Sequence, residues 1–126
     1  MRLLLDTHVY LWCVNDDRRL SKEIRNKIYD ATEVYVSSAS IWEAAIKIKL
    51  KKLQAQLNQL VHAITTSGFI ELPISAKHAA FVSELPDHHR DPFDRILISQ
   101  AMTEPLKLLT ADSLLEKYSE LVELIC

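Results

Sequence analysis

The sequence predicts an α/β fold in which helices cover a mostly parallel β-sheet. Short apolar runs of strand length alternate with longer segments of helical periodicity along the chain. No two predicted strands are joined by a tight hairpin turn, so their connections are expected to pass through helices. The length of 126 residues and the hydrophobic content of 48% suit one domain, spanning residues 1–126, around one core.

The N-terminal part of the chain predicts two strands and two helices. Leu3–Leu5 is an apolar run that stops at Asp6, as expected of a buried strand ending at an exposed polar edge. A short helix is predicted over residues 7–14. Ser21 is a suitable N-cap for a second helix. Glu33–Ser37 is rich in β-branched and aromatic residues and is predicted to be the second strand.

The middle of the chain predicts two helices and a third strand. Apolar residues at helical spacing predict a helix over Ser40–Leu53 and another over Gln56–Thr66. Gly68 is placed to end the second of these helices. Phe69–Leu72 is then predicted to be a short strand, closed by Pro73.

The C-terminal part repeats the same alternation. A helix is predicted over Ser75–Leu85, and a second over Pro92–Met102, with proline at its first position. A strand that ends at Thr110 follows, and a short helix is expected to begin at residue 112 or 113. Val122–Ile125 completes the series as a possible last strand.

Composition excludes several function classes. Gly68 is the only glycine, so neither a dinucleotide-binding fingerprint nor a P-loop is present. The net charge of -2 gives no global basic field, although a local basic patch would suffice for nucleic acid. Cys13 and Cys126 form no disulfide framework or zinc motif, which favours a reducing cytoplasm. The first apolar run is too short for a signal peptide or a membrane span.

Acidic residues stand where helices begin after strands or loops, and each has a structural explanation of its own. Asp6 would cap the first helix, and Glu43 could complete a capping box with Ser40 or pair with Lys47. Asp91 would cap the helix that starts at Pro92, and Asp94 would interact favourably with the dipole of that helix. Asp112 would cap the last helix in competition with a Ser113–Glu116 box. Taken singly, these acids therefore do not establish a site.

The shared position of Asp6, Glu43, Asp94 and Asp112 changes this interpretation. In a parallel sheet the strand-to-helix junctions lie at one edge, so these carboxylates are expected to gather there. Gathered carboxylates repel one another, and a hard cation such as Mg²⁺ or Mn²⁺ removes the conflict. The chemistry that suits such a site is metal-assisted hydrolysis of a phosphodiester. Lys47, Arg90 and Arg95 are the candidates for contacting phosphate.

Four segments carry a resemblance to a known family. They are Leu-Leu-Leu-Asp-Thr-His at 3–8, Ser-Ala-Ser-Ile-Trp-Glu-Ala-Ala-Ile-Lys at 38–47, Arg-Asp-Pro-Phe-Asp-Arg at 90–95 and Leu-Leu-Thr-Ala-Asp at 108–112. In this order and spacing they resemble the PIN domain, and within it the VapC toxins of toxin–antitoxin pairs. The resemblance implies a three-layer α/β/α sandwich that cuts RNA with Mg²⁺ or Mn²⁺.

The resemblance also assigns residues and partners. It implies that Asp6, Glu43, Asp94 and Asp112 hold metal, that Thr110 orients a ligand, and that Asp91 is a further acid of the motif. It implies a homodimer and a cognate antitoxin, for which the apolar helices between Ile41 and Ile64 are the expected binding face.

Two other functions compete with the nuclease. A phosphoryl-acceptor domain also places an Asp after its first strand, but its second signature is missing, because His8 stands where a second Asp is needed and the third strand ends in Leu72-Pro73. A non-catalytic RNA-binding or protein-interaction module on the same fold would be expected to have lost the acids. All of them are present, which favours the nuclease.

Overall fold

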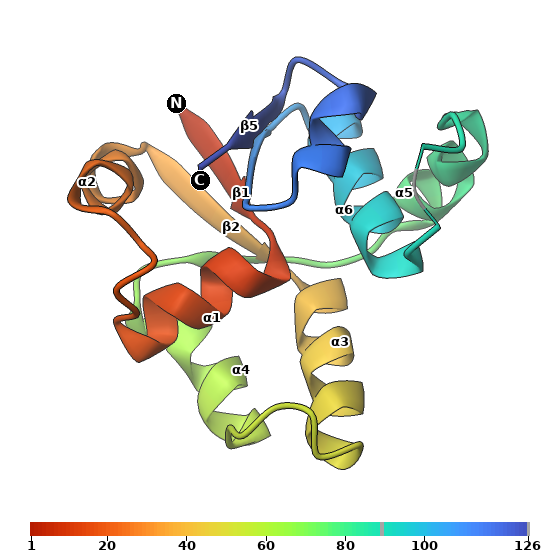
Figure 1. Cartoon of the computed structure of the whole chain (residues 1–126). Helices are drawn as coiled ribbons and strands as arrows, with labels where there is room; N and C mark the ends of the chain where they lie inside the picture. Colours follow the sequence, from red (N-terminus) through yellow and green to blue (C-terminus); the bar gives the residue numbers. More distant parts are fainter. Residues whose placement is uncertain (89, 126) are drawn as a thin grey trace.

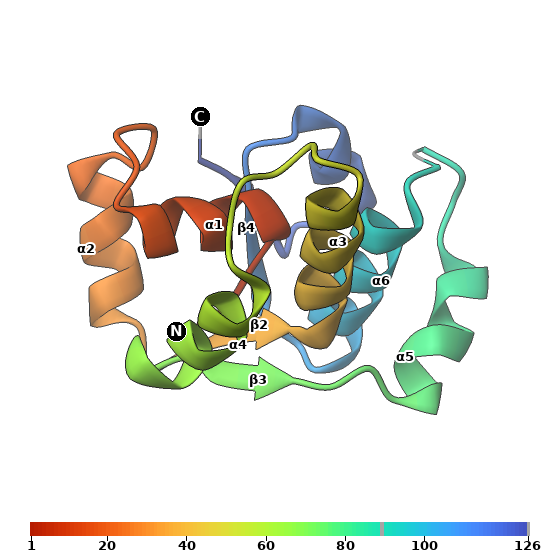
Figure 2. The same cartoon turned by 90° about the horizontal axis from the view of Figure 1, so that it is seen from below.

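The fold is built on a five-stranded sheet in which every neighbouring pair of strands is parallel. The computed structural model describes residues 1–88 and 90–125. The strand order is β3-β2-β1-β4-β5; Figure 1 labels β2, β1 and β5, and Figure 2 labels β3 and β4. The strands are β1 (Arg2–Leu5), β2 (Glu33–Ser37), β3 (Ile70–Leu72), β4 (Lys107–Thr110) and β5 (Val122–Leu124). The predicted parallel sheet is thus confirmed.

The helices lie on both sides of this sheet, as expected when parallel strands are joined by crossovers. Figures 1 and 2 place α1 and α2 on one side and α5 and α6 on the other. The helices are α1 (Thr7–Asn15), α2 (Lys22–Asp30), α3 (Ser38–Lys49), α4 (Leu57–Thr66), α5 (Ala76–Phe81) and α6 (Pro92–Thr103), with the 3₁₀ helices η1 (Val82–Glu84) and η2 (Ser113–Tyr118). The three-layer α/β/α sandwich is confirmed.

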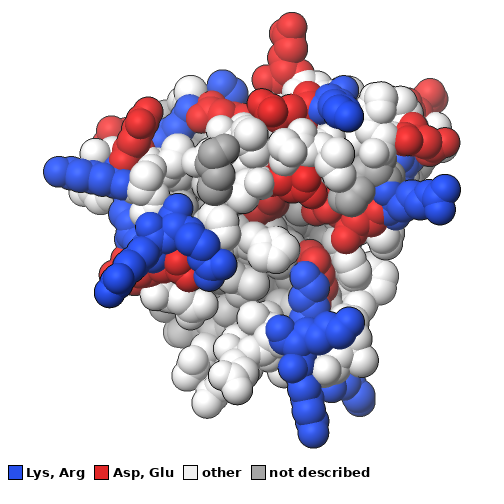
Figure 3. Space-filling view, viewed as in Figure 1, with Lys and Arg blue, Asp and Glu red and all other residues white. Residues whose placement is uncertain are grey.

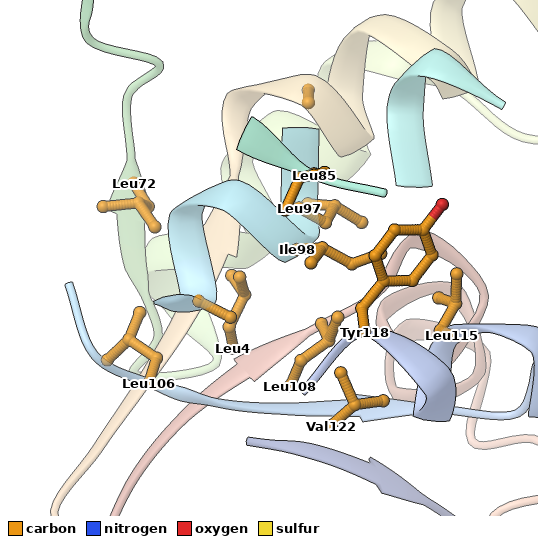
Figure 4. Packing of buried hydrophobic residues seen from close by; sticks show 12 residues of the cluster. Leu4, Leu72, Leu85, Leu97, Ile98, Leu106, Leu108, Leu115, Tyr118 and Val122 are labelled. Atoms are coloured by element: carbon orange, nitrogen blue, oxygen red, sulfur yellow. The ribbon is translucent and has the colours of Figure 1, made fainter. Parts of the chain in front are cut away.

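Alternation along the strands builds a separate core on each face of the sheet. Leu4 of β1 belongs to one core, with side chains from α6 and η2 (Figure 4). Leu3 and Leu5 of the same strand point to the other core, which α1, α2 and α4 complete. Both faces of β1 are therefore buried, and its uninterrupted leucine run follows from that position.

Helix α3 differs from its predicted bounds at both ends. It begins at Ser38, because the Ser37 hydroxyl accepts a hydrogen bond from the Ala39 N–H (3.0 Å) and caps the helix there. It ends at Lys49, since Lys51 adopts a left-handed backbone conformation with φ of 60°. The helix predicted over Ser40–Leu53 therefore exists, but it begins two residues earlier and ends four residues earlier than predicted.

The structure also bears on the helix predicted over Ser75–Leu85, on membrane spans and on the two cysteines. The segment predicted as one helix over Ser75–Leu85 divides into α5 and η1, and the last helix is a 3₁₀ helix. Among the described residues no helix has the length and apolarity needed to cross a membrane. Cys13 is a half-buried free thiol, whereas Cys126 lies outside the described residues.

Candidate active site

The predicted acids come together in one cleft of about 550 Å³ at the carboxyl ends of β1 and β4. The topology explains the place, because the chain proceeds from β1 to β2 and β3 on one side and returns to β4 on the other. In Figure 3 acidic side chains lie near the centre of this face with lysine and arginine side chains around them. The cleft is lined by Asp6, His8, Trp12, Glu43, Lys47, Asp91, Asp94, Ala111, Asp112 and Ser113.

Asp6 is held from both carboxylate oxygens. Its Oδ1 accepts a hydrogen bond from the Val9 N–H (2.8 Å), which confirms the predicted cap of α1. Its Oδ2 accepts a second bond from the Thr110 hydroxyl (2.5 Å). Asp6 is only 4% exposed, and this burial raises the pKa of its carboxyl, while the bonds from Thr110 and Val9 oppose the rise. Capping and membership of the cleft are thus compatible.

Thr110 lies behind the cleft and orients two of its acids. The side chain is fully buried at the end of β4 and is not part of the cleft wall. Its hydroxyl donates to Asp6 and accepts from the Asp112 N–H (3.0 Å). Because the hydroxyl proton is directed at Asp6, the geometry gives Thr110 a positioning role for Asp6 and Asp112.

Glu43 is buried without belonging to a capping box. Ser37 caps α3, so Glu43 lies in the second turn, and the predicted Ser40–Glu43 box is wrong. The Ser40 hydroxyl instead accepts a hydrogen bond from the Thr7 hydroxyl (2.9 Å), which joins the starts of α3 and α1. The alternative explanation is confirmed, because the Lys47 Nζ lies 2.9 Å from the Glu43 Oε2.

The remaining acids line the cleft from the starts of α6 and η2. Asp91 caps α6, with its Oδ1 accepting from the Phe93 N–H (2.8 Å) and the Asp94 N–H (3.1 Å). Asp94 lies in the first turn of the same helix. Asp112 caps η2 by accepting from the Leu114 N–H (2.9 Å), so Asp112 prevails over the competing Ser113 box.

The donor set of the cleft fits a hard divalent cation. Five carboxylates face one ammonium group, Lys47, and oxygen is the ligand that Mg²⁺ and Mn²⁺ prefer. Within residues 1–88 and 90–125, no three Asp, Glu, His or Cys side chains already converge on a common point. Asp6 turns its oxygens to Thr110 and Val9, and Glu43 turns to Lys47. Asp6, Glu43, Asp91 and Asp112 therefore share the cleft while other groups of the protein hold their carboxylates.

Two of the three basic candidates lie elsewhere. Lys47 lines the acidic cleft, whereas Arg90 and Arg95 line a separate apolar groove beside α6. Arg95 donates to the backbone carbonyls of Pro86 (3.0 Å), Val82 (3.3 Å) and Leu85 (3.4 Å). These bonds hold the segment before α6, so the structure gives Arg95 a supporting role in the fold.

Two cleft residues were not selected as site residues from the sequence. His8 is exposed and lines the cleft. Trp12 is largely buried and contributes to the cleft wall. Their spacing from Asp6, two and six residues on, was the available signal, since α1 begins at the cleft.

Comparison with known proteins finds one sequence family, a relative and several solved structures that are similar to this chain. The sequence model of the PIN domain matches residues 3–121. Ribonuclease VapC22 of Mycobacterium tuberculosis is 30% identical over 122 residues, which cover 92% of this chain and 91% of that protein. The structure resembles VapBC2 from Rickettsia felis, solved with a promoter DNA fragment (TM-score 0.75, 18% identity, full coverage of both chains). It also resembles a toxin–antitoxin complex from Klebsiella pneumoniae (TM-score 0.67, 19% identity, 96% of this chain and 95% of that one).

Proposed function

The chain belongs to the PIN domain family, and on that premise we propose that it is a VapC-type ribonuclease toxin that hydrolyses RNA phosphodiester bonds with Mg²⁺ or Mn²⁺. One observation carries the proposal. Five carboxylates from four separate segments of the chain line a single cleft at the point where the strand order reverses. Helix capping explains three of them singly, but it does not explain why all five share one cleft.

The proposed roles follow from position and burial. Asp6, Glu43 and Asp94 would hold the cation, and Asp112 would hold a second ion or its waters. When bound, the cation supplies charge neutralisation at the phosphate and makes a water easier to deprotonate. Thr110 keeps the Asp6 carboxylate in place. Lys47 is the cleft residue proposed to contact the RNA backbone, with Arg90 and Arg95 as more distant candidates.

An antitoxin partner is proposed for the apolar surface of α3. Trp42 and Ile46 on this helix and Leu50 at its C-cap recur every four residues and are all exposed. The groove beside α6, of about 480 Å³, continues this surface, since Trp42 also lines it. An exposed apolar stripe with an adjoining groove is typical of a surface that receives an amphipathic segment. A homodimer is also expected, and size-exclusion chromatography with light scattering tests it.

RNA cleavage tests the nuclease proposal directly. Purified chain is incubated with RNA and Mn²⁺, alongside Asp6→Asn and Asp94→Asn, which remove a ligand charge with little change in shape. Asp30→Asn is the matched control, because Asp30 is exposed at the end of α2 and does not line the cleft. Both cleft variants are expected to lose cleavage while the control retains it. Undiminished cutting by either cleft variant would overturn the assignment.

A second measurement separates the nuclease from a non-catalytic module on the same fold. Because only the folded state assembles the carboxylates, Mn²⁺ should raise the melting temperature of the wild-type chain. The shift should be absent in Asp6→Asn and present in Asp30→Asn. No shift in the wild-type chain at millimolar Mn²⁺ would favour the module.

A further inference from the structure

We propose that Lys47 is a displaceable counter-ion, which neutralises Glu43 while the cleft holds no cation and is released toward the RNA phosphate when Glu43 binds one. The inference rests on the proposed function, because it concerns the same cleft. It assigns Lys47 two positions, one on Glu43 and one on the substrate.

The burial of the pair supports the first position. The Lys47 Nζ lies 2.9 Å from the Glu43 Oε2, with the Glu43 side chain 8% exposed and the Lys47 side chain 34% exposed. A buried carboxylate without a partner is strongly disfavoured, so Glu43 needs a positive charge beside it. Lys47 is the only lysine or arginine on the described wall of the cleft, and it supplies that charge.

The charge balance of the cleft explains why the pair can open. Five carboxylates share the cleft with this single ammonium group, so a divalent cation compensates more negative charge than Lys47 does. Once Glu43 has turned to the cation, the ammonium has lost its partner. Its four-carbon stem is flexible, and an ammonium is a good point charge for a phosphate.

An ordinary surface ion pair is the competing explanation. Pairs four residues apart on an exposed helix stabilise it only weakly and have no further function. This pair differs because both side chains line the cleft and the carboxylate is almost completely buried. Lys49, on the same helix but exposed and outside the cleft wall, represents the ordinary case and is the natural control.

Calorimetric titration with Mn²⁺ tests whether Lys47 competes with the cation for Glu43. Lys47→Met keeps the aliphatic stem and removes the competing charge, so it should bind Mn²⁺ about three- to tenfold more tightly than the wild type. Lys49→Met loses the same charge and should bind nearly as the wild type does. In a Glu43→Gln background the effect of Lys47→Met should shrink, because the competition has already been removed.

RNA binding tests whether Lys47 contacts the RNA phosphate once a cation is present. With Ca²⁺ replacing Mn²⁺, Lys47→Met should raise the Kd for a single-stranded RNA several-fold more than Lys49→Met does. Equal Mn²⁺ affinity of wild type and Lys47→Met, or an equal gain in the Glu43→Gln background, would overturn the inference.

The outcome stays interpretable in two further cases. If Lys47→Met does not fold, Lys47→Arg replaces it, and its two-pronged bond to Glu43 should weaken Mn²⁺ binding; unchanged binding would again overturn the inference. Wild-type chain that neither binds Mn²⁺ nor cuts RNA would instead refute the proposed function, so the two failures are distinguishable.

Discussion

At the scale of single residues, Asp6 caps a helix although its burial disfavours the charged form of its carboxyl group. Its carboxylate caps α1 and accepts from Thr110, yet burial raises its pKa. The folded chain therefore binds the Asp6 proton more tightly than the unfolded chain, whose aspartates titrate near the ordinary value of 3.8. Stability of the metal-free protein should rise as the pH falls through the raised pKa toward that value.

Replacement of Asp6 by Asn should reveal the free-energy cost of burying the Asp6 charge. Asparagine caps a helix about as well as aspartate but carries no charge. Without metal, Asp6→Asn should melt at or above the wild-type temperature near pH about 7, and the advantage should fade on acidification as wild-type Asp6 becomes protonated. Thermal melts in the presence of a chelator, followed by circular dichroism across this pH range, provide the measurement. A variant that is less stable than wild type at every pH would contradict the expectation.

Thr110 offers a second residue-scale prediction. Thr110→Val preserves the shape but removes the donor to Asp6 and the acceptor for the Asp112 N–H. The loss should lower the free energy of unfolding by about 1–3 kcal/mol. RNA cleavage should fall on the order of tenfold or more, as when a group that orients a metal ligand is removed. Urea denaturation and a cleavage assay measure the two effects.

Thr110→Ser is the matched control for this prediction, because it restores the hydroxyl while removing only a methyl group. It should recover most of the cleavage and most of the stability. If the Val and Ser variants behave alike, the hydroxyl has no part in positioning Asp6. Any loss that the two variants share then comes from altered packing.

At the scale of secondary structure, the bounds of β2 were predicted accurately and the start of α3 was not. Glu33–Ser37 has the predicted bounds, because a β-branched run paired on both sides leaves little choice. The start of α3 was misplaced, since Ser37 and Ser40 are equally good caps in sequence and only the position of β2 decides between them. This error concealed the burial of Glu43 in the second turn, which no local pattern indicates.

The start of α6 allows capping by Asp91 to be separated from metal binding. Asp91→Ala removes the Oδ1 that accepts hydrogen bonds from the Phe93 and Asp94 N–H groups, and should cost about 1 kcal/mol of stability. Asp91→Asn keeps the cap and should preserve stability. If capping is the whole role of Asp91, Asn should also bind Mn²⁺ as the wild type does, measured by calorimetry. A large loss of affinity in Asp91→Asn would instead make Asp91 a ligand.

At the scale of the whole molecule, the sequence predicted that the acids share an edge but not which strands bring them together. Asp6 and Thr110 are separated by 104 positions and meet because β4 returns beside β1. Nothing local specifies that adjacency, which depends on how the helices cover both faces of the sheet. The same holds for Arg95, whose position beside Asp94 in sequence suggested phosphate, whereas the packing of η1 against α6 directs it to backbone carbonyls.

The outer surface of α3 provides the prediction that involves the molecule as a whole. Trp42 is 60% exposed, packs edge-on against Phe93 (ring centroids 5.1 Å apart) and joins the α3 stripe to the groove beside α6. Trp42→Ala should weaken binding of the proposed antitoxin partner by at least about 2 kcal/mol, because tryptophans that become buried in an interface are frequent binding hot spots. Tyr29→Ala is the control, since Tyr29 is 88% exposed on α2 and lies on neither feature. Calorimetry of each variant with the purified antitoxin measures the difference, and RNA cleavage by the free chain should be preserved in both.

Equal weakening by the two variants would mean that the antitoxin covers more than the α3 surface, and unchanged binding by Trp42→Ala would place it on another face.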